Sequence, residues 1–270
     1  MIADAVTAIP AKAQATGSLL AAALKPTDGR WENGLAWRSE RCFAAAGFGV
    51  CDPTPDPVEP APFNLESVYP QGYVIADECT TLGGDMDEAR VRRQAEAVAS
   101  FMVARELWTG TLTAANPATV DGSPYVNPSL DSGATVVASV ATGVVARLAA
   151  LEQAAMVSAN GQQVFLHLPP HLVLGLGNLL RLTGDLLVTP LGNVIVADAG
   201  YPGSGPAGTG TEWAFATGPV AVRLTPVEVI TDMVATLDRT TNRRKLWARR
   251  EFAAAFDACT HFAIDTSATA

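Results

Sequence analysis

Two histidines stand at a spacing that could bind a metal ion. His167 and His171 are four residues apart, as are two zinc ligands on one face of a helix. Pro169 and Pro170 lie between them, however, and proline interrupts the helical geometry that this spacing requires. No glutamate follows His167 to serve as a general base. We therefore interpret the two histidines as residues of a strand end and a helix start, and we expect no metal ligand.

A serine in a glycine-rich stretch is the second candidate for chemistry. Ser204 lies between Gly203 and Gly205, but Pro202 occupies the position at which a nucleophile elbow has its first glycine. The stretch also ends without the Lys-Ser or Lys-Thr pair of a phosphate-binding loop. The pattern predicts a loop over residues 200–210 and no catalytic residue.

A partial dinucleotide-binding fingerprint is the third candidate. Gly175 and Gly177 lie in an apolar run after a strand, but Leu180 stands where the third glycine belongs. A partial match of this kind is expected by chance, so we expect no cofactor and no cofactor-binding residue. Acidic pairs such as Asp77-Glu78 are explained by strand ends, and acid-base catalysis needs a pocket that the sequence does not reveal.

Composition and charge limit the kinds of partner. The 270 residues carry a formal net charge of -9, and 17% of them are charged whereas 49% are hydrophobic. This composition supplies a core and leaves much of the surface uncharged, which favours large subunit interfaces over an isolated monomer. The acidic balance argues against a nucleic-acid-binding module, because contacts to phosphates need clustered Lys and Arg.

One cluster of basic residues is present although the chain as a whole is acidic. It consists of Arg239, Arg243, Arg244, Lys245, Arg249 and Arg250. The cluster fits either a solvated strand face paired with carboxylates or a contact to nucleic acid.

Cysteine usage and the start of the chain give no sign of export. The cysteines form neither a C-x-x-C pair nor a zinc-like spacing, so we expect free thiols at Cys42, Cys51, Cys79 and Cys259. The residues after Met1 lack the basic start and apolar core of a signal peptide. No uninterrupted apolar run reaches the roughly 18 residues of a transmembrane span.

The first part of the chain indicates an arm, an extended connection, a strand and a long helix. Residues 1–30 are alanine-rich with one short helical stretch, whereas residues 52–62 have a proline at nearly every second position, which excludes a helix. Residues 69–78 have the composition of a strand. Asp85 and Glu88 have the spacing of a capping box, so we expect a helix of about seven turns to begin there.

The second part mixes helices and strands. Residues 134–158 predict a helix that is apolar nearly all round and should therefore be central. Residues 186–197 have a turn signal at Pro190-Leu191-Gly192-Asn193 and predict a hairpin. Further strands are predicted at 164–168, 213–217, 220–225, 227–230, 245–256 and 261–265, and a helix at 171–180. The fold class is therefore α+β.

Four ordered stretches resemble the capsid proteins of the Hong Kong 97 fold, especially those of phages that infect actinobacteria. The first runs from 68 through the long helix to 111, and the fourth covers 241–263. The second and third contain QVFLHLPP at 163–170, LVTPLGNVIV at 187–196 and AFATGPVAVR at 214–223. Together they cover most of residues 66–265.

The resemblance implies a major capsid protein with an axial domain and a peripheral domain. Its parts are an N-terminal arm (1–32), an extended loop with its flanking strand (33–84), a peripheral domain with a spine helix (85–133), an axial domain (134–235) and returning peripheral strands (236–270). Such a subunit self-assembles as hexamers and pentamers into an icosahedral head shell around the phage genome. The resemblance favours an intersubunit charge face for the basic cluster.

The implied partners are other copies of the chain, with portal, scaffolding and decoration proteins as further candidates. Packaged DNA lies inside such a shell without sequence-specific binding, and no membrane is involved. The implied location is the virion, after assembly in the cytoplasm of the host bacterium. Because no long charged N-terminal segment is present, we expect any scaffold to be a separate protein or absent.

The chain departs from some family members in its lysines. Those members crosslink a lysine of the extended loop to an asparagine of a neighbour. Here the lysines are Lys12, Lys25 and Lys245, with none between residues 31 and 110. We therefore expect no such isopeptide bonds.

Three alternatives to a phage capsid protein remain open at this point. An encapsulin-like bacterial compartment shell has the same fold and differs in its cargo. An enzyme that uses His167, His171 or Ser204 belongs to a different class. A tail-tube or decoration protein is disfavoured, because those folds are mostly β and the predicted helix is long.

Overall fold

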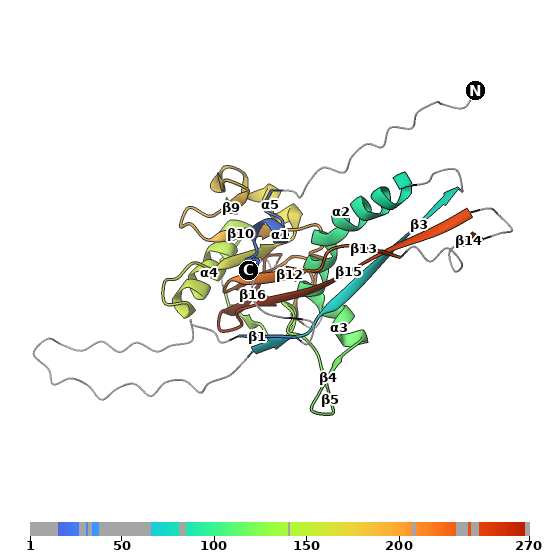
Figure 1. Cartoon of the computed structure of the whole chain (residues 1–270). Coiled ribbons are helices and arrows are strands. Elements are labelled where there is room, and N and C mark those ends of the chain that lie inside the picture. Colours follow the sequence, from blue (N-terminus) through green and yellow to red (C-terminus); the bar gives the residue numbers. More distant parts are fainter. Residues whose placement is uncertain are drawn as a thin grey trace, which may run out of the picture.

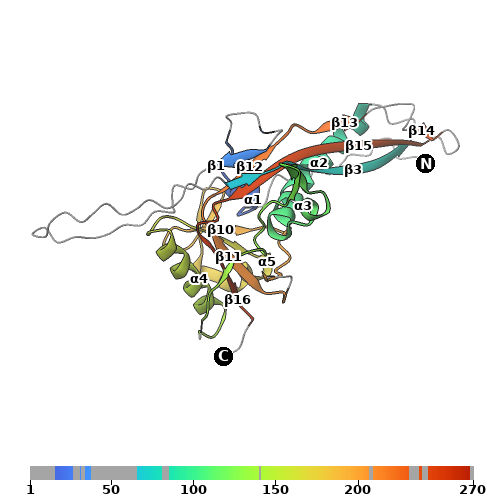
Figure 2. The ribbon, with the colours of Figure 1, turned by 90° about the horizontal axis from the view of Figure 1, so that it is seen from below.

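The computed structural model describes residues 16–26, 31, 34–37, 66–80, 85–139, 141–206, 209–230, 237–238 and 243–267. Helices and strands are mixed in these residues, as predicted. An elongated lobe contains α2 (Asp85–Thr109), β3 (Gln71–Thr80) and β15 (Arg243–Phe256), and a compact lobe contains α4 (Val144–Ser158) and β16 (His261–Asp265) (Figures 1 and 2). The predicted long helix from Asp85 and the strand that precedes it are confirmed.

The elongated lobe is organised around β15. β3 pairs with it in antiparallel fashion from Gln71 opposite Phe252 to Thr80 opposite Arg243. The other strands of this sheet are β12 (Val220–Leu224), β13 (Glu228–Ile230) and β14 (Leu237–Asp238), and all three pair antiparallel with β15. In the first half of β15, Leu246 and Ala248 are buried and their neighbours are more exposed, so one face of this part of the sheet is buried.

Helix α2 covers that buried face (Figure 1). Val91, Ala95, Ala99 and Val103 recur every four residues and are buried, which is the stripe that a helix packed on a sheet requires. The hydroxyl of Tyr73 on β3 donates to the carbonyl of Ala95 at 2.7 Å.

Trp108, near the end of α2, packs where the two lobes meet. Its indole is completely buried, and it lies 4.8 Å from the ring of Tyr201 and 4.9 Å from the ring of Phe215, centroid to centroid. The helix ends before Gly110, which has a φ of 60° and so supplies the left-handed conformation of a helix C-terminus. The two lobes are therefore joined through a continuous apolar core.

The compact lobe contains a seven-stranded mixed sheet. Its order is β6 (Thr135–Val136), β16, β11 (Trp213–Thr217), β7 (Phe165–Leu168), β10 (Val194–Ala197), β9 (Leu186–Val188) and β8 (Arg181–Thr183). The pairs β6–β16 and β7–β10 are parallel, and the others are antiparallel. The predicted hairpin is confirmed as β9–β10.

Helix α4 differs from its prediction in start and in surroundings. It begins at Val144 and not near residue 134, because residues 135–136 pair with β16 and Gly143 has a φ of 85°. The expectation that it is central is also wrong. It packs against the compact sheet through Leu148, Leu151 and Ala155, but its outer side lies at the surface of the lobe.

Several short elements complete the described fold. They are α1 (Leu19–Ala22), β1 (Leu35–Trp37), β2 (Glu66–Val68), α3 (Thr111–Ala115), β4 (Ala118–Val120), β5 (Ser123–Tyr125), α5 (Pro170–Leu176) and the 3-10 helix η1 (Gly177–Leu179). The β4–β5 hairpin extends away from both lobes (Figure 1). Among the described helices, none combines the length and apolarity needed to cross a membrane.

The two sheets divide the chain differently from the expected domain ranges. β12 and β13 fall within the range expected for the axial domain (134–235), yet they pair with β15 in the elongated lobe. β16 falls within the range expected for returning peripheral strands (236–270), yet it pairs with β11 in the compact lobe. The ranges differ because strands far apart in the sequence pair with each other. β15 is long enough for several short strands to pair with it. Much of the expected arm and extended loop (1–32 and 33–84) lies outside the described residues.

Candidate functional site

His167 lies in the core, and both of its ring nitrogens are engaged. Nδ1 is 2.8 Å from the hydroxyl of Tyr201, and Nε2 is 2.9 Å from Oγ1 of Thr217. Thr217 donates its own hydrogen to the carbonyl of Gly218 at 2.7 Å, so we assign Nε2 as the donor to Thr217 and Nδ1 as the acceptor from Tyr201. Complete burial lowers the pKa of His167 to about 3, and the ring is neutral at neutral pH.

His171 lies apart from this network. It is in the first turn of α5 with an exposed side chain, whereas His167 belongs to the preceding strand. The predicted locations, a strand and a helix start, are confirmed. Because neither nitrogen of His167 is free, the two histidines do not form a metal-binding pair.

Ser204 is part of a packing loop. Its backbone carbonyl accepts the indole N–H of Trp108 at 2.8 Å, and its hydroxyl oxygen is 3.2 Å from the same nitrogen. A Cβ at Gly200 would lie 2.3 Å from the carbonyl oxygen of Phe101, so only glycine allows this close approach to α2. Gly200 therefore serves packing against α2, whereas a Cβ at Gly205 would clash with the ring of Trp213.

The partial glycine fingerprint lies at the wrong end of a helix. Gly177 follows Leu176, the last residue of α5, and has a φ of 48°. A dinucleotide site needs its glycines before a helix, so that the helix N–H groups can bind the pyrophosphate. Gly175 and Gly177 do not provide that arrangement.

Glu66, Asp257 and Cys259 are close enough to be considered as metal ligands, since one ligand atom of each lies within 4.8 Å of the others. Cys259 is disulfide-bonded, however, so the expectation of free thiols is wrong for this residue. A disulfide sulfur is not a thiolate, the form of cysteine that binds metals. Burial raises the pKa of Glu66, which also disfavours its anionic form. The cluster therefore does not make a metal centre.

The basic cluster is described over part of its length. Nε of Arg249 lies 2.7 Å from the carboxylate of Glu228, and Nε of Arg250 donates to the carbonyl of Thr225 at 2.7 Å. Arg239 lies outside the described residues. The pairing of Arg249 agrees with the interpretation of a strand face that is paired with carboxylates.

A buried carboxylate that the sequence did not reveal joins three parts of the chain. Oδ2 of Asp198 accepts the N–H of Leu19 at 3.0 Å and the hydroxyl of Ser100 at 2.5 Å, and Oδ1 accepts the N–H of Gly200 at 3.0 Å. Asp198 follows β10, so this contact fixes residues near α1 against the compact lobe and α2. No local sequence signal marks it.

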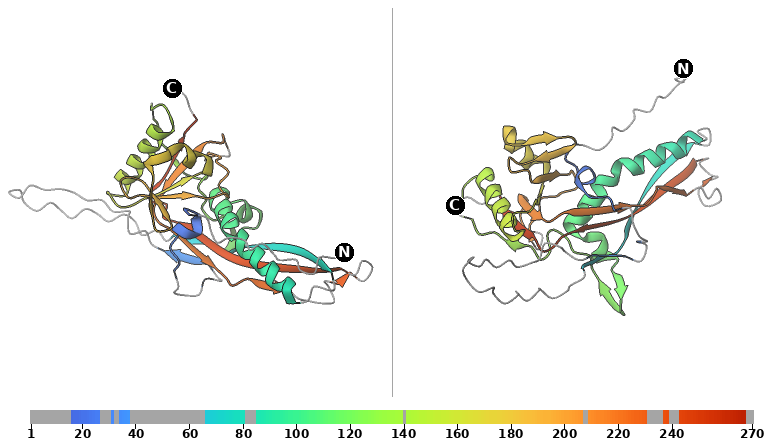
Figure 3. Two further views of the ribbon diagram at one scale, coloured as in Figure 1. Left: turned by 90° about the horizontal axis from the view of Figure 1, so that it is seen from above. Right: turned by 60° about the vertical axis from the view of Figure 1, so that its left-hand side comes forward.

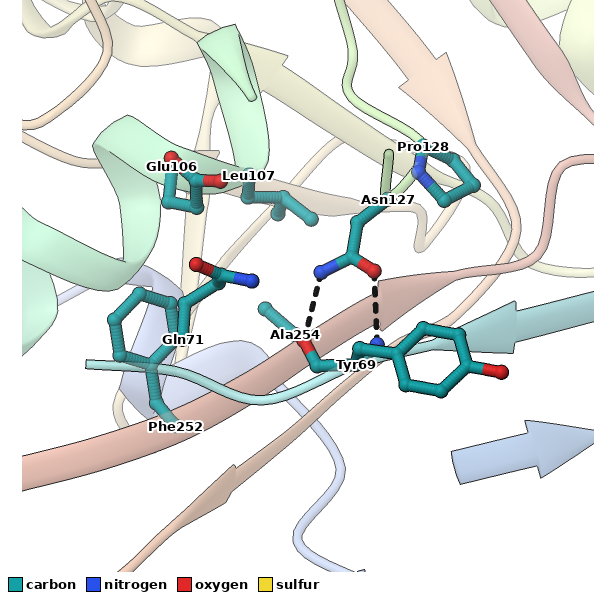
Figure 4. Close-up of a pocket in the computed structure, with 8 residues that line it drawn as sticks. All are labelled: Tyr69, Gln71, Glu106, Leu107, Asn127, Pro128, Phe252 and Ala254. Atoms are coloured by element: carbon teal, nitrogen blue, oxygen red, sulfur yellow. Dashed lines mark hydrogen bonds between the residues drawn. The ribbon is translucent and has the colours of Figure 1, made fainter. Parts of the chain in front are cut away.

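A second polar junction lies between the start of β3 and the end of α2 (Figure 4). Asn127 accepts the N–H of Tyr69 at 2.8 Å and donates to the carbonyl of Tyr69 at 2.7 Å. Glu106 accepts the N–H groups of Leu112 and Thr113 at 2.7 and 2.8 Å, which caps α3. The cavity beside them measures about 10 Å³, roughly the space of one water, so it holds no substrate.

These side chains position the lobes and the β4–β5 hairpin. Of the candidate residues above, His167, Ser204, Glu106 and Arg249 take part in packing, capping or ion pairing, and His171 is exposed.

Sequence comparison identifies no relative. No protein-family profile matches the chain, and no curated protein matches it.

Solved structures match nearly the whole chain. A structure from Gordonia phage Cozz has a TM-score of 0.56 at 13% identity, covering 100% of this chain and 92% of that one. The capsid of an empty GTA particle, computed with C5 symmetry, has a TM-score of 0.59 at 8% identity, and the match covers 99% of this chain and 94% of that one. The capsid of Myoviridae phage XM1 has a TM-score of 0.54 at 11% identity, and the match covers 98% of this chain and 95% of that one. The chain therefore has the fold found in these phage and GTA capsids.

Proposed function

We propose that this chain is the major capsid protein of a tailed bacteriophage, with a Hong Kong 97-type fold, and not an enzyme. It self-assembles as hexamers and pentamers into the icosahedral head shell that encloses the genome. The observation that carries the proposal is the match in fold over nearly the full length of both chains. A match of this extent supports a role as a shell subunit.

In this proposal the elongated lobe is the peripheral domain, with α2 as its spine helix, and the compact lobe is the axial domain. The peripheral domain then includes β12 and β13 as well as β15, and the axial domain includes β16. Residues 1–32 form the arm and the loop within 33–84 extends to neighbouring subunits. Because β15 and β16 follow one another, the end of the chain connects the two domains.

The surface of the chain suits a shell. Closed shells use heterologous contacts that close on themselves, and many weak contacts add up to a stable lattice. The β4–β5 hairpin extends beyond the lobes, as an element that contacts a neighbour must do. The basic cluster is an intersubunit charge face in this proposal.

The shell contains packaged DNA without sequence-specific contacts, and the net charge of -9 agrees with weak affinity for phosphates. Portal, scaffolding and decoration proteins are its further partners. The subunit is located in the virion and assembles in the cytoplasm of the host bacterium.

The proposal is tested by expressing the chain alone and analysing the product by sedimentation and negative-stain imaging. Shells, pentamers or hexamers are the expected products. Small monomers that persist under every assembly condition would contradict the proposal. Nucleic acid extracted from native particles supports a phage head, whereas a protein cargo without DNA would favour an encapsulin-like compartment.

A further inference from the structure

An apolar cavity opens on the surface of the compact lobe. It has a volume of about 210 Å³ and lies between α4, the α5–η1 segment and the turn that joins β9 to β10. In Figure 3 these segments, coloured from yellow-green to yellow, lie together on the outside of that lobe. Among the residues that line the cavity, Glu152 is the one with an ionisable side chain.

Hydrogen bonds within its own lobe engage the carboxyl group of Glu152. Its Oε1 accepts the hydroxyl of Thr189 at 2.6 Å and the side-chain amide of Asn193 at 2.6 Å. These contacts fix the β9–β10 turn against α4. Apart from Glu152 and Thr189, the residues that line the cavity are apolar.

The rim of the cavity is apolar and exposed. Val145, Leu179 and Leu191 line it and are 48%, 46% and 68% exposed. On the adjoining elements α5 and β8, Leu174 and Leu182 are 84% and 64% exposed. Exposed apolar groups concentrated around one hollow mark an interaction site.

The exposed outer side of helix α4 is an independent reason to expect that another molecule covers this surface. Its outer side carries Val145, Ala146, Ala149, Gln153 and Val157, without a charged residue. A helix that is apolar on nearly all faces is normally buried on all of them. In the single chain the inner side of α4 is buried and the outer side is exposed.

We propose that this cavity receives an apolar side chain from a second copy of the chain, an inference that rests on the proposed shell function. Copies that each carry a net charge of -9 repel one another, so they make close contact most readily through uncharged surface. The cavity and its rim are such a surface. No Lys or Arg lines the cavity, which disfavours a nucleic acid as its occupant.

The size of the cavity fits this occupant. An apolar cavity of about 150 Å³ in another protein holds a benzene molecule. A hollow of about 210 Å³ can therefore hold a leucine or phenylalanine side chain of a neighbour. In a closed ring of identical subunits, each copy then provides one cavity and fills one other.

The occupant is identified by photocrosslinking. The full chain is expressed with p-benzoylphenylalanine in place of Leu191, assembled, irradiated and analysed by denaturing gel and mass spectrometry. We expect a covalent dimer of the chain in assembled particles and none in dissociated subunits at the same concentration. Shells that form without this dimer, or that crosslink to another protein or to DNA, overturn the inference while leaving the proposed function intact. Absence of any shell contradicts both.

A matched pair of variants tests the role of the cavity. Ala149→Trp fills the cavity from its own exposed helix face. Ala97→Trp makes the same exchange at an exposed position of α2, away from the cavity lining and from the outer side of α4. With both variants folded as judged by their thermal midpoints, Ala149→Trp should lower the assembled fraction at least tenfold and Ala97→Trp less than twofold. Equal effects of the two variants overturn the inference.

Discussion

The carboxylate of Asp198 holds the backbone of Leu19, although the two residues are 179 positions apart in the sequence. The same carboxylate accepts the hydroxyl of Ser100 on α2 and the N–H of Gly200. One buried carboxyl group thus connects α1, α2 and the loop after β10. Because loss of a buried acceptor leaves its donors without a partner, this junction should contribute measurably to stability.

We expect Asp198→Ala to lower the free energy of unfolding by about 2–4 kcal/mol, because it leaves buried donors without an acceptor. Urea unfolding of the unassembled subunit measures this change. Asp185→Ala is the control, since Asp185 is exposed in a turn, and it should change the free energy of unfolding by less than about 0.5 kcal/mol. Equal losses in the two variants would show that Asp198 is not a junction.

His167 should make the fold sensitive to acid. Its pKa falls from an ordinary value of 6.5 to about 3 in the folded chain because of burial, so the unfolded chain binds the proton more readily. Stability is therefore lost as pH decreases from about 6.5 towards 3, by up to about 1.4 kcal/mol per pH unit. Burial also lowers the pKa of His261, which acts in the same direction.

Comparison with His167→Gln isolates the effect of this histidine. The variant should be less stable at pH 7. Between pH 7 and pH 5, however, its free energy of unfolding should fall by about 2 kcal/mol less than that of the parent chain. Urea unfolding at the two pH values measures the difference. The same pH dependence in both proteins would mean that folding does not lower the pKa of His167.

We expect the disulfide of Cys259 to be present in assembled particles. Peptide mapping of particles without reductant should recover a linked pair that contains Cys259 and separates on reduction. Recovery of Cys259 as an alkylated free thiol from denatured particles is the contrary result.

Denatured shells should migrate as single chains near 28.1 kDa. The lysines are at positions 12, 25 and 245, so the extended loop has no amine to form an isopeptide bond. A reducing gel of boiled particles tests this directly. A ladder of higher-mass bands would require another crosslinking chemistry and would refute the expectation.

Local signals in the sequence predict much of the fold. Asp85 and Glu88 correctly indicate the start of α2, and the turn at 190–193 correctly indicates the β9–β10 hairpin. These features depend on residues close together in the chain, where capping and turn chemistry act.

Long-range pairing explains what the sequence did not predict. The start of α4 depends on β6 pairing with β16, more than 120 residues later, and the sheet to which β12 belongs depends on β15. In the sequence, a metal pair at His167 and a nucleophile elbow at Ser204 are disfavoured by the nearby prolines at positions 169, 170 and 202. Asp198 and Asn127 could not be identified, because Leu19 and Tyr69 are 179 and 58 positions away from them.

Cryo-electron microscopy of the product assembled from the chain tests whether this protein forms a capsid shell. We expect closed shells with five-fold vertices, in which each subunit has α2 alongside the β3–β15 pair and a compact lobe with the seven-stranded sheet. A product that consists solely of dispersed 28.1 kDa monomers at every salt, pH and protein concentration would contradict this expectation.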